Sequence, residues 1–255
     1  MRSRWSRAEA WAVFGFALFF FVLPNLQQRV SGAAQTSAAP AGTAQLLLGL
    51  AVLPALTLVL VWCMASRARG AREVLDTVFG SVRPRSSAAK AGAADLLRAV
   101  GLGVAVGLAS IPLTGVLMKA TELVLVRLGA EAGVQNAMQM FLDPAAPPLH
   151  RVAISLHAIL LAPLCEEILF RSVILTSLLR KAPPGSSGLV SSPWRAIWIS
   201  AVFFAGVHMF LAGLPSLTVL GVLFAVLFLR TGTLWSSVAM HVVFNACNLL
   251  MALAR

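Results

Sequence analysis

Long apolar runs separated by short polar segments dominate the chain. A helix needs about 20 mostly apolar residues to cross a bilayer, and seven runs approach or reach this length. They lie at about 9–26, 45–65, 96–118, 152–178, 195–211, 215–230 and 235–254. The pattern therefore predicts an all-α protein, a polytopic transmembrane helical bundle of about seven spans.

The composition agrees with this pattern. Of the 255 residues, 59% are hydrophobic and 11% are charged, whereas soluble domains carry roughly 25% charged residues. We therefore expect an integral membrane protein, and the richness in Ala and Arg favours a bacterial inner (cytoplasmic) membrane. The net charge is +11, but the basic residues flank apolar runs instead of alternating with exposed aromatic residues. This placement predicts contact with a lipid bilayer and not with nucleic acid.

The polar segments predict the orientation of the chain. The first apolar run follows MRSRWSR, and we interpret it as a retained first helix, not a cleaved signal. The basic segment 66–95 predicts a solvated cytoplasmic loop, with a short surface helix at 71–80. Because most Lys and Arg residues fall on the same side as this loop, the N-terminus should lie inside and the C-terminus outside.

Two adjacent glutamates and an arginine interrupt the apolar run at 152–178. Glu166 and Glu167 are the only acidic residues after Asp143, and a charge at mid-bilayer costs about 2.5–3.5 kcal/mol on insertion scales. Glu167 and Arg171 are four positions apart and share a helix face, which predicts an ion pair. Glu166 points about 100° away and is therefore available as a general base or acid.

Two histidines in later apolar runs each have a partner one helical turn away. Phe204 and His208 are four residues apart, as are His241 and Asn245, so each pair projects from one helix face. Polar side chains from separate spans avoid lipid by facing the bundle interior. We therefore predict that Glu166, His208 and His241 meet there.

Three motifs in this region resemble, in their order along the chain, those of the CPBP family: Glu166-Glu167-x-x-x-Arg171, Phe204-x-x-x-His208 and His241-x-x-x-Asn245. This family contains CAAX prenyl-protein endoproteases and bacteriocin-processing or self-immunity (Abi-type) proteins. The resemblance covers about residues 151–250. It implies an intramembrane endopeptidase that cleaves a membrane-anchored protein or peptide, either at a CAAX-type site or at a C-terminal sorting signal. We accordingly divide the chain into N-terminal transmembrane helices with a basic cytoplasmic loop (1–150) and a CPBP-like catalytic membrane core (151–255).

The resemblance also implies a role for each candidate residue. Glu166 and His208 would activate a water molecule for attack on the peptide bond. His241 and Asn245 would stabilise the oxyanion, where one hydrogen-bond donor can be worth about 2.7–4 kcal/mol. The residues that would organise the site are Glu167, Arg171 and Phe204.

Zinc is the alternative to a mechanism without a cofactor. Two carboxylates and two histidines could hold this ion and leave a position for water. The sequence has no HExxH pattern, and if Glu166 were a ligand, Glu167 would have to leave Arg171 to serve as the base. We therefore expect catalysis without a metal or other cofactor.

Two functions other than proteolysis stay open. Acids and histidines inside spans also mark transporters and proton relays, although the internal repeat typical of many transporters is not visible here. A non-catalytic bacteriocin-immunity protein is the other alternative, although it would not need a complete set of catalytic motifs.

Overall fold

The computed structural model describes residues 43–65, 78–79, 92–130, 141–179 and 192–254, together with Gly15. Every regular element in these ranges is helical, which confirms the all-α prediction. Four helices are long and apolar enough to cross a membrane: Ala93–Arg127, Pro148–Leu178, Leu211–Thr231 and Leu234–Leu253. Two further apolar stretches, Gly49–Cys63 and Pro193–Val207, are shorter. The predicted span at 9–26 lies outside the described residues, apart from Gly15, so the number of seven spans stays a prediction.

Two helices precede the region of the candidate residues, α3 (Thr43–Ala65) and α5 (Ala93–Arg127). The 35 residues of α5 correspond to a length of about 52 Å at 1.5 Å per residue. This helix is therefore longer than the hydrocarbon core of a bilayer, which is about 30 Å thick. Beyond the predicted span 96–118, Lys119 and Glu122 form an exposed ion pair at 2.7 Å, as suits a helix that leaves the apolar layer.

The chain from Pro148 to Leu178 forms one continuous helix, here called the core helix. Its consecutive segments are α7 (Pro148–Leu156), η3 (His157–Leu161), α8 (Ala162–Glu167), η4 (Ile168–Leu175) and α9 (Thr176–Leu178). The segments η3 and η4 are π-helical. The predicted α-helical span at 152–178 missed this change of pitch. π-Helical turns are rare and often occur at functional sites. Their position on both sides of the glutamate pair therefore makes this part of the core helix a candidate functional site.

Three helices complete the bundle: α10 (Pro193–Val207), α11 (Leu214–Thr231) and α12 (Leu234–Leu253). A short 3₁₀ turn, η5 (Leu211–Gly213), lies between α10 and α11. Gly232 adopts the left-handed conformation with φ 73° at the end of α11. Because glycine enters this region without steric cost, the chain can turn at once into α12.

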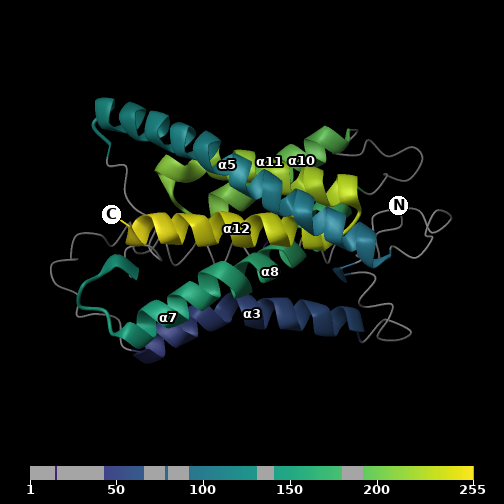
Figure 1. Ribbon diagram of the computed structural model, residues 1–255, viewed down its shortest axis with the longest axis horizontal. Coiled ribbons are helices and arrows are strands. Elements are labelled where there is room, and N and C mark those ends of the chain that lie inside the picture. The colour runs from purple at the N-terminus through teal and green to yellow at the C-terminus, as the bar shows by residue number, and fades with distance from the viewer. Residues whose placement is uncertain are drawn as a thin grey trace.

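The helices α5 and α12 lie side by side and run in the same direction (Figure 1). A Cβ atom on Gly103 would lie 2.1 Å from the carbonyl oxygen of Ser236, and one on Gly107 would lie 2.9 Å from that of Met240. Small residues at these positions therefore allow the two backbones to approach closely. The core helix runs in the opposite direction, as alternating membrane spans require.

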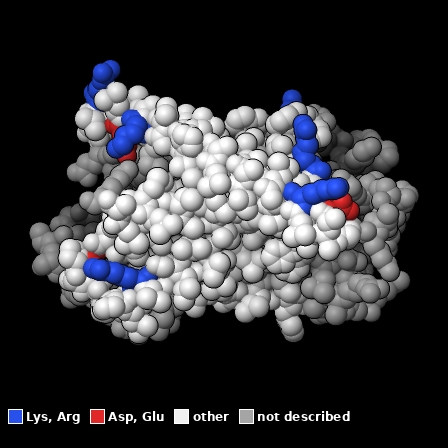
Figure 2. Space-filling view, in the orientation of Figure 1, with Lys and Arg blue, Asp and Glu red and all other residues white. Residues whose placement is uncertain are grey.

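Charged side chains gather toward the two ends of the elongated molecule, and a broad uncharged band lies between them (Figure 2). Large apolar side chains are exposed along α5, including Leu102, Leu113 and Val116. An exposed apolar band of this kind fits the lipid chains of a bilayer. The protein is therefore an integral membrane protein.

The tryptophans of the described residues mark one end of this band. They lie at the end of α3 and at the starts of α10 and α12, which are at the same end of the bundle (Figure 1). They are all exposed: Trp62, Trp194, Trp198 and Trp235. Because tryptophan is enriched where membrane meets water, we assign this end to a membrane–water boundary.

Part of the predicted surface helix at 71–80 is buried instead. Val78 is 2% exposed, and its carbonyl oxygen accepts a hydrogen bond from Ser172 Oγ of the core helix at 2.6 Å. The Phe79 ring stacks on Trp235 of α12, with centroids 5.3 Å apart. These two residues therefore pack onto the core helix and α12 and are not solvated, while the rest of this segment lies outside the described residues.

Candidate active site

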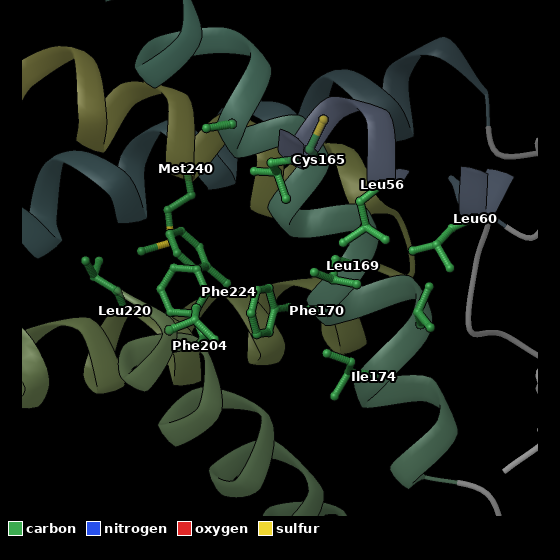
Figure 3. Packing of buried hydrophobic residues seen from close by; sticks show 14 of the residues in the cluster. Leu56, Leu60, Cys165, Leu169, Phe170, Ile174, Phe204, Leu220, Phe224 and Met240 are labelled. Carbon is green, nitrogen blue, oxygen red and sulfur yellow. The ribbon is translucent and has the colours of Figure 1, made fainter. Parts of the chain in front are cut away.

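Three aromatic rings from different helices pack together in the interior of the bundle (Figure 3). The Phe204 ring of α10 packs edge to face against Phe170 of the core helix, at 5.2 Å between centroids, and against Phe224 of α11, at 5.8 Å. All three side chains are almost completely buried. This packing keeps water away and so strengthens electrostatic interactions next to the rings.

Glu167 and Arg171 form an ion pair, as their spacing predicts. Arg171 Nε lies 3.0 Å from Glu167 Oε2, and both side chains are completely buried. The guanidinium carbon lies 5.0 Å from the ring centroids of both Phe204 and Phe224. The guanidinium nitrogens lack a well-aligned hydrogen bond within the described part of the chain. The cation is therefore held by the charge of the carboxylate and by the faces of the rings.

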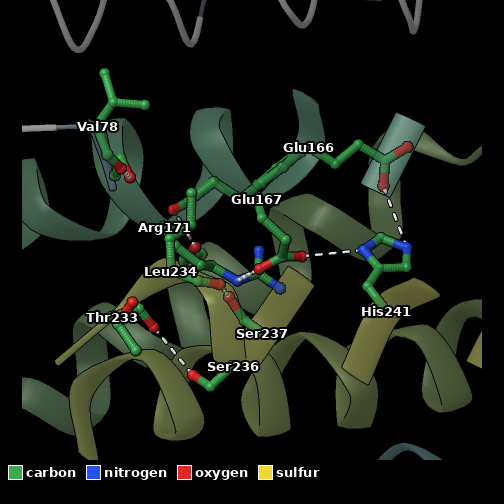
Figure 4. Close-up of polar contacts among 12 residues, drawn as sticks. Val78, Glu166, Glu167, Arg171, Thr233, Leu234, Ser236, Ser237 and His241 are labelled. Carbon is green, nitrogen blue, oxygen red and sulfur yellow. Dashed lines mark hydrogen bonds and ion pairs between the residues drawn. The ribbon is translucent and has the colours of Figure 1, made fainter. Parts of the chain in front are cut away.

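Glu167 also connects Arg171 to His241, as the close-up in Figure 4 shows. His241 Nδ1 lies 3.1 Å from Glu167 Oε1, while Oε2 of the same carboxylate faces Arg171. Because a carboxylate only accepts hydrogen bonds, Nδ1 carries a proton. The His241 ring stacks on Phe224 with centroids 4.6 Å apart. The ring is thereby fixed with Nε2 directed toward Glu166.

Glu166 lies between the two histidines. Its Oε2 is 3.9 Å from His208 Nε2 and 3.8 Å from His241 Nε2. These distances exceed direct hydrogen bonds, but one water oxygen can lie about 2.8 Å from both Glu166 and either ring. The side chains of Glu166 and His208 are 17% and 14% exposed, whereas Glu167 is completely buried. Of the two adjacent acids, only Glu166 has a partly exposed side chain, and its Oε2 atom is buried without a hydrogen-bond partner in the described part of the chain.

His208 follows directly after α10, which ends at Val207, four residues before the predicted end of the span at 211. Its Nδ1 is 2.7 Å from the carbonyl oxygen of Phe204, and because a carbonyl only accepts, Nδ1 carries the proton. Its other ring nitrogen, Nε2, faces Glu166. The next residue, Met209, has φ 49°, a left-handed conformation that costs a residue other than glycine about 1–2 kcal/mol. The backbone turn that places His208 is therefore locally strained.

Asn245 contacts the core helix. It lies one turn after His241 on α12, and its Nδ2 donates to the carbonyl oxygen of Ala158 in η3 at 2.8 Å. An amide nitrogen carries two hydrogens, and this bond uses one of them. The structure thus joins α12 to the core helix through Asn245 as well as through His241.

Sequence reasoning missed Phe224, which lies against both Arg171 and His241. No polar residue one turn away distinguishes it within the apolar sequence of α11. Pro163 was also missed, although a signal was present. A proline inside an apolar helix removes a backbone donor and distorts the helix, and Pro163 lies only three residues before Glu166.

The fit of zinc to this site can be judged from the distances. Two ligand atoms about 2.1 Å from a tetrahedral zinc ion are about 3.4 Å apart. The separations from Glu166 Oε2 to the two imidazole nitrogens, 3.8 and 3.9 Å, are wider. Among the described residues, no group of three or more His, Cys, Asp or Glu side chains is arranged to hold a metal ion. A zinc site would therefore require these side chains to move closer together.

The fold and this site define an integral membrane protein with a carboxylate and two imidazoles gathered beside a buried ion pair. Residues 148–247 match the family model described as type II CAAX prenyl endopeptidase Rce1-like. The chain therefore carries an Rce1-like domain of the CPBP family, in agreement with its three motifs. This domain supports intramembrane endopeptidase activity of the CAAX type in general. No curated protein and no solved structure matched the chain.

Proposed function

We propose that the protein is an intramembrane endopeptidase that hydrolyses a peptide bond of a membrane-anchored protein or peptide with water activated by Glu166 and His208. The observation that carries the proposal is the convergence of Glu166 Oε2 with His208 Nε2 at 3.9 Å and with His241 Nε2 at 3.8 Å. This convergence occurs inside an apolar bundle, where uncompensated ionisable groups are costly. The Rce1-like domain covers all of these residues.

Glu166 acts as the general base. One hydrogen of the water passes to Glu166 Oε2 while the other is hydrogen-bonded to His208 Nε2. The water oxygen forms a bond to the carbonyl carbon, and the electron pair of the C=O bond moves to the carbonyl oxygen. The contact of His208 Nδ1 with the Phe204 carbonyl at 2.7 Å supports this role, because it keeps Nε2 available as an acceptor.

His241 and Asn245 stabilise the resulting oxyanion. His241 donates from Nε2 as an imidazolium whose Nδ1–H is bound to Glu167, and Asn245 donates the amide hydrogen that Ala158 does not use. When the tetrahedral intermediate collapses, the C–N bond breaks and the leaving nitrogen takes the proton from Glu166. The products are a carboxylic acid and an amine. Loss of one such donor usually lowers turnover about 10²–10³-fold.

Glu167, Arg171 and Phe204 organise the site without touching the substrate. Glu167 orients His241, Arg171 balances the charge of Glu167, and Phe204 packs against Arg171 and against both histidine rings. The substrate is either a CAAX-type protein or one with a C-terminal sorting signal. The bacterial cytoplasmic membrane is the proposed location, on the basis of composition.

Two probes test this function on the purified full-length protein in proteoliposomes. One is an internally quenched farnesylated peptide that ends in a CAAX sequence, and the other is an apolar C-terminal anchor peptide. Glu166→Gln keeps the shape and hydrogen-bonding capacity of the side chain but cannot take a proton. It should abolish cleavage with an unchanged melting temperature, while Glu122→Gln on the surface of α5 should cleave normally. Cleavage by Glu166→Gln at the native rate would refute the role of Glu166.

The metal question is settled on the same preparation. We expect elemental analysis to find no stoichiometric zinc and chelators to leave cleavage unchanged. One zinc per chain, lost with activity on chelation and restored together with it, would contradict the proposed mechanism. Proton uptake that depends on Glu166, without cleavage of either peptide, would support a proton relay instead.

A further inference from the structure

The helix that carries Glu166 has a backbone carbonyl that its own backbone does not satisfy. In η3 the N–H of Ala162 donates to the carbonyl of His157, five residues earlier. By the same pattern Ala158 would accept from residue 163, but this residue is Pro163, which has no N–H. Ala158 is thus left without the backbone donor from either the fourth or the fifth following residue.

Asn245 supplies the missing donor from another helix. Its Nδ2 lies 2.8 Å from the Ala158 carbonyl oxygen although the two residues are 87 positions apart in sequence. Where no water is available, an unpaired carbonyl is costly, and prolines in membrane helices are tolerated when neighbouring groups satisfy the freed backbone. Asn245 therefore donates a hydrogen bond to the Ala158 carbonyl that Pro163 leaves without a backbone donor.

We propose that Pro163 is a positioning residue and that the bond from Asn245 to Ala158, made with the amide hydrogen that Asn245 does not offer to the oxyanion, fixes the core helix against α12 and so places the Glu166 carboxylate. The bond at Ala158 attaches the core helix to α12 before Glu166. The contact between Glu167 Oε1 and His241 Nδ1, at 3.1 Å, attaches it again directly after Glu166. Glu166 is thus held between two contacts with the same helix.

Asn248 provides a matched comparison on α12. It lies three residues beyond Asn245, and its Nδ2 donates to the carbonyl of Phe244 at 2.8 Å, within its own helix. Both asparagines thus donate one amide hydrogen to a backbone carbonyl at the same distance. Only the bond of Asn245 joins two helices and depends on the missing N–H of Pro163.

A thermal double-mutant cycle tests the contact. In the native background, Asn245→Ala leaves the Ala158 carbonyl unpaired and should lower the melting temperature by roughly 3–10 °C. Pro163→Ala restores an N–H that can donate to Ala158. In that background, Asn245→Ala should lower the melting temperature by less than half as much, whereas Asn248→Ala should have the same effect in both backgrounds. An equal effect of Asn245→Ala in the two backgrounds would overturn the proposal.

Turnover then distinguishes positioning from simple packing. The catalytic meaning of the contact rests on the proposed function, and the farnesylated CAAX-type peptide is the probe. Pro163→Ala should lower kcat by about 10- to 10²-fold without raising KM or lowering the melting temperature, although Pro163 has no group that could react. Native kcat in this variant would overturn the positioning role.

Two provisions keep the result interpretable. Pro163→Ser also restores the N–H and takes the place of Pro163→Ala if the latter does not fold, with the same outcomes expected. If the native protein cleaves neither peptide, the proposed function fails, but the thermal cycle still decides whether the contact exists. The two failures are therefore distinguishable.

Discussion

Replacing Arg171 with methionine tests how the buried charges of the site are held. Methionine is a long, flexible apolar side chain that can fill much of the same space. It would leave the completely buried Glu167 carboxylate without the guanidinium that now lies 3.0 Å away. Removing one partner of a buried ion pair typically costs about 3–5 kcal/mol, because an uncompensated charge stays behind. The variant also loses the contacts between the guanidinium and three aromatic rings, whose centroids lie 5.0–5.8 Å from the guanidinium carbon. Loss of these cation–π contacts adds to the free-energy cost.

Thermal unfolding in detergent measures this effect. For a chain of this size, the expected loss corresponds to a fall in melting temperature on the order of 10 °C. The control is Arg98→Met, which breaks a pair with Asp95 of α5 at 3.8 Å whose side chains are 83% and 62% exposed. Exposed pairs contribute at most about 1 kcal/mol, so this variant should melt close to the native temperature.

A double variant separates the charge from the packing. In Glu167→Gln combined with Arg171→Met, the buried carboxylate and the buried guanidinium are removed together, and the glutamine oxygen can still accept from His241 Nδ1. The double variant should therefore melt at a higher temperature than Arg171→Met alone. If Arg171→Met melts like the native protein and yet is inactive, the argument from the buried pair is wrong, and Arg171 acts directly on the substrate.

Two further predictions concern the arrangement of the helices. Single cysteines introduced at Ala94, before the span of α5, and at Ala254, after α12, should react with impermeant reagents from opposite sides of the membrane, and labelling from the same side would contradict the predicted orientation. Gly103→Ala should lower the melting temperature, because its Cβ would lie 2.1 Å from the carbonyl oxygen of Ser236. In contrast, Gly101→Ala, which meets no atom within 4 Å, should be neutral or slightly stabilising, and equal effects of the two changes would refute the close contact between α5 and α12.

Features of the site that depend on neighbours along one helix could be predicted from the sequence. Four residues are slightly more than one turn of an α-helix and slightly less than one turn of a π-helix. Glu167 and Arg171 therefore face the same side in either geometry, and their pairing survives the unpredicted π-helical segment η4. The same local reasoning separates Glu166 from this pair and places Phe204 beside His208.

Features that depend on contacts between distant segments could not be predicted in this way. Phe224 is distinguished only by the rings and charges that α11 brings it against. The partner of Asn245 is a backbone carbonyl, and no residue type in the sequence marks it. Val78 lies in a polar segment that predicts a solvated loop. It is buried because its carbonyl accepts a hydrogen bond from Ser172 and its side chain packs in an apolar cluster.

The adjacent glutamates show how one sequence feature can yield two different chemical roles. Because successive residues of a helix are turned by about 100°, Glu167 faces Arg171 and the aromatic rings, while Glu166 faces the two imidazole nitrogens. The charge of Glu167 is compensated, and its oxygens are occupied by Arg171 and His241. Glu166 has no arginine within its own turn and retains partial exposure. The Glu167 carboxylate therefore pairs with Arg171 and orients His241. The Glu166 carboxylate lies where it can take a proton from water.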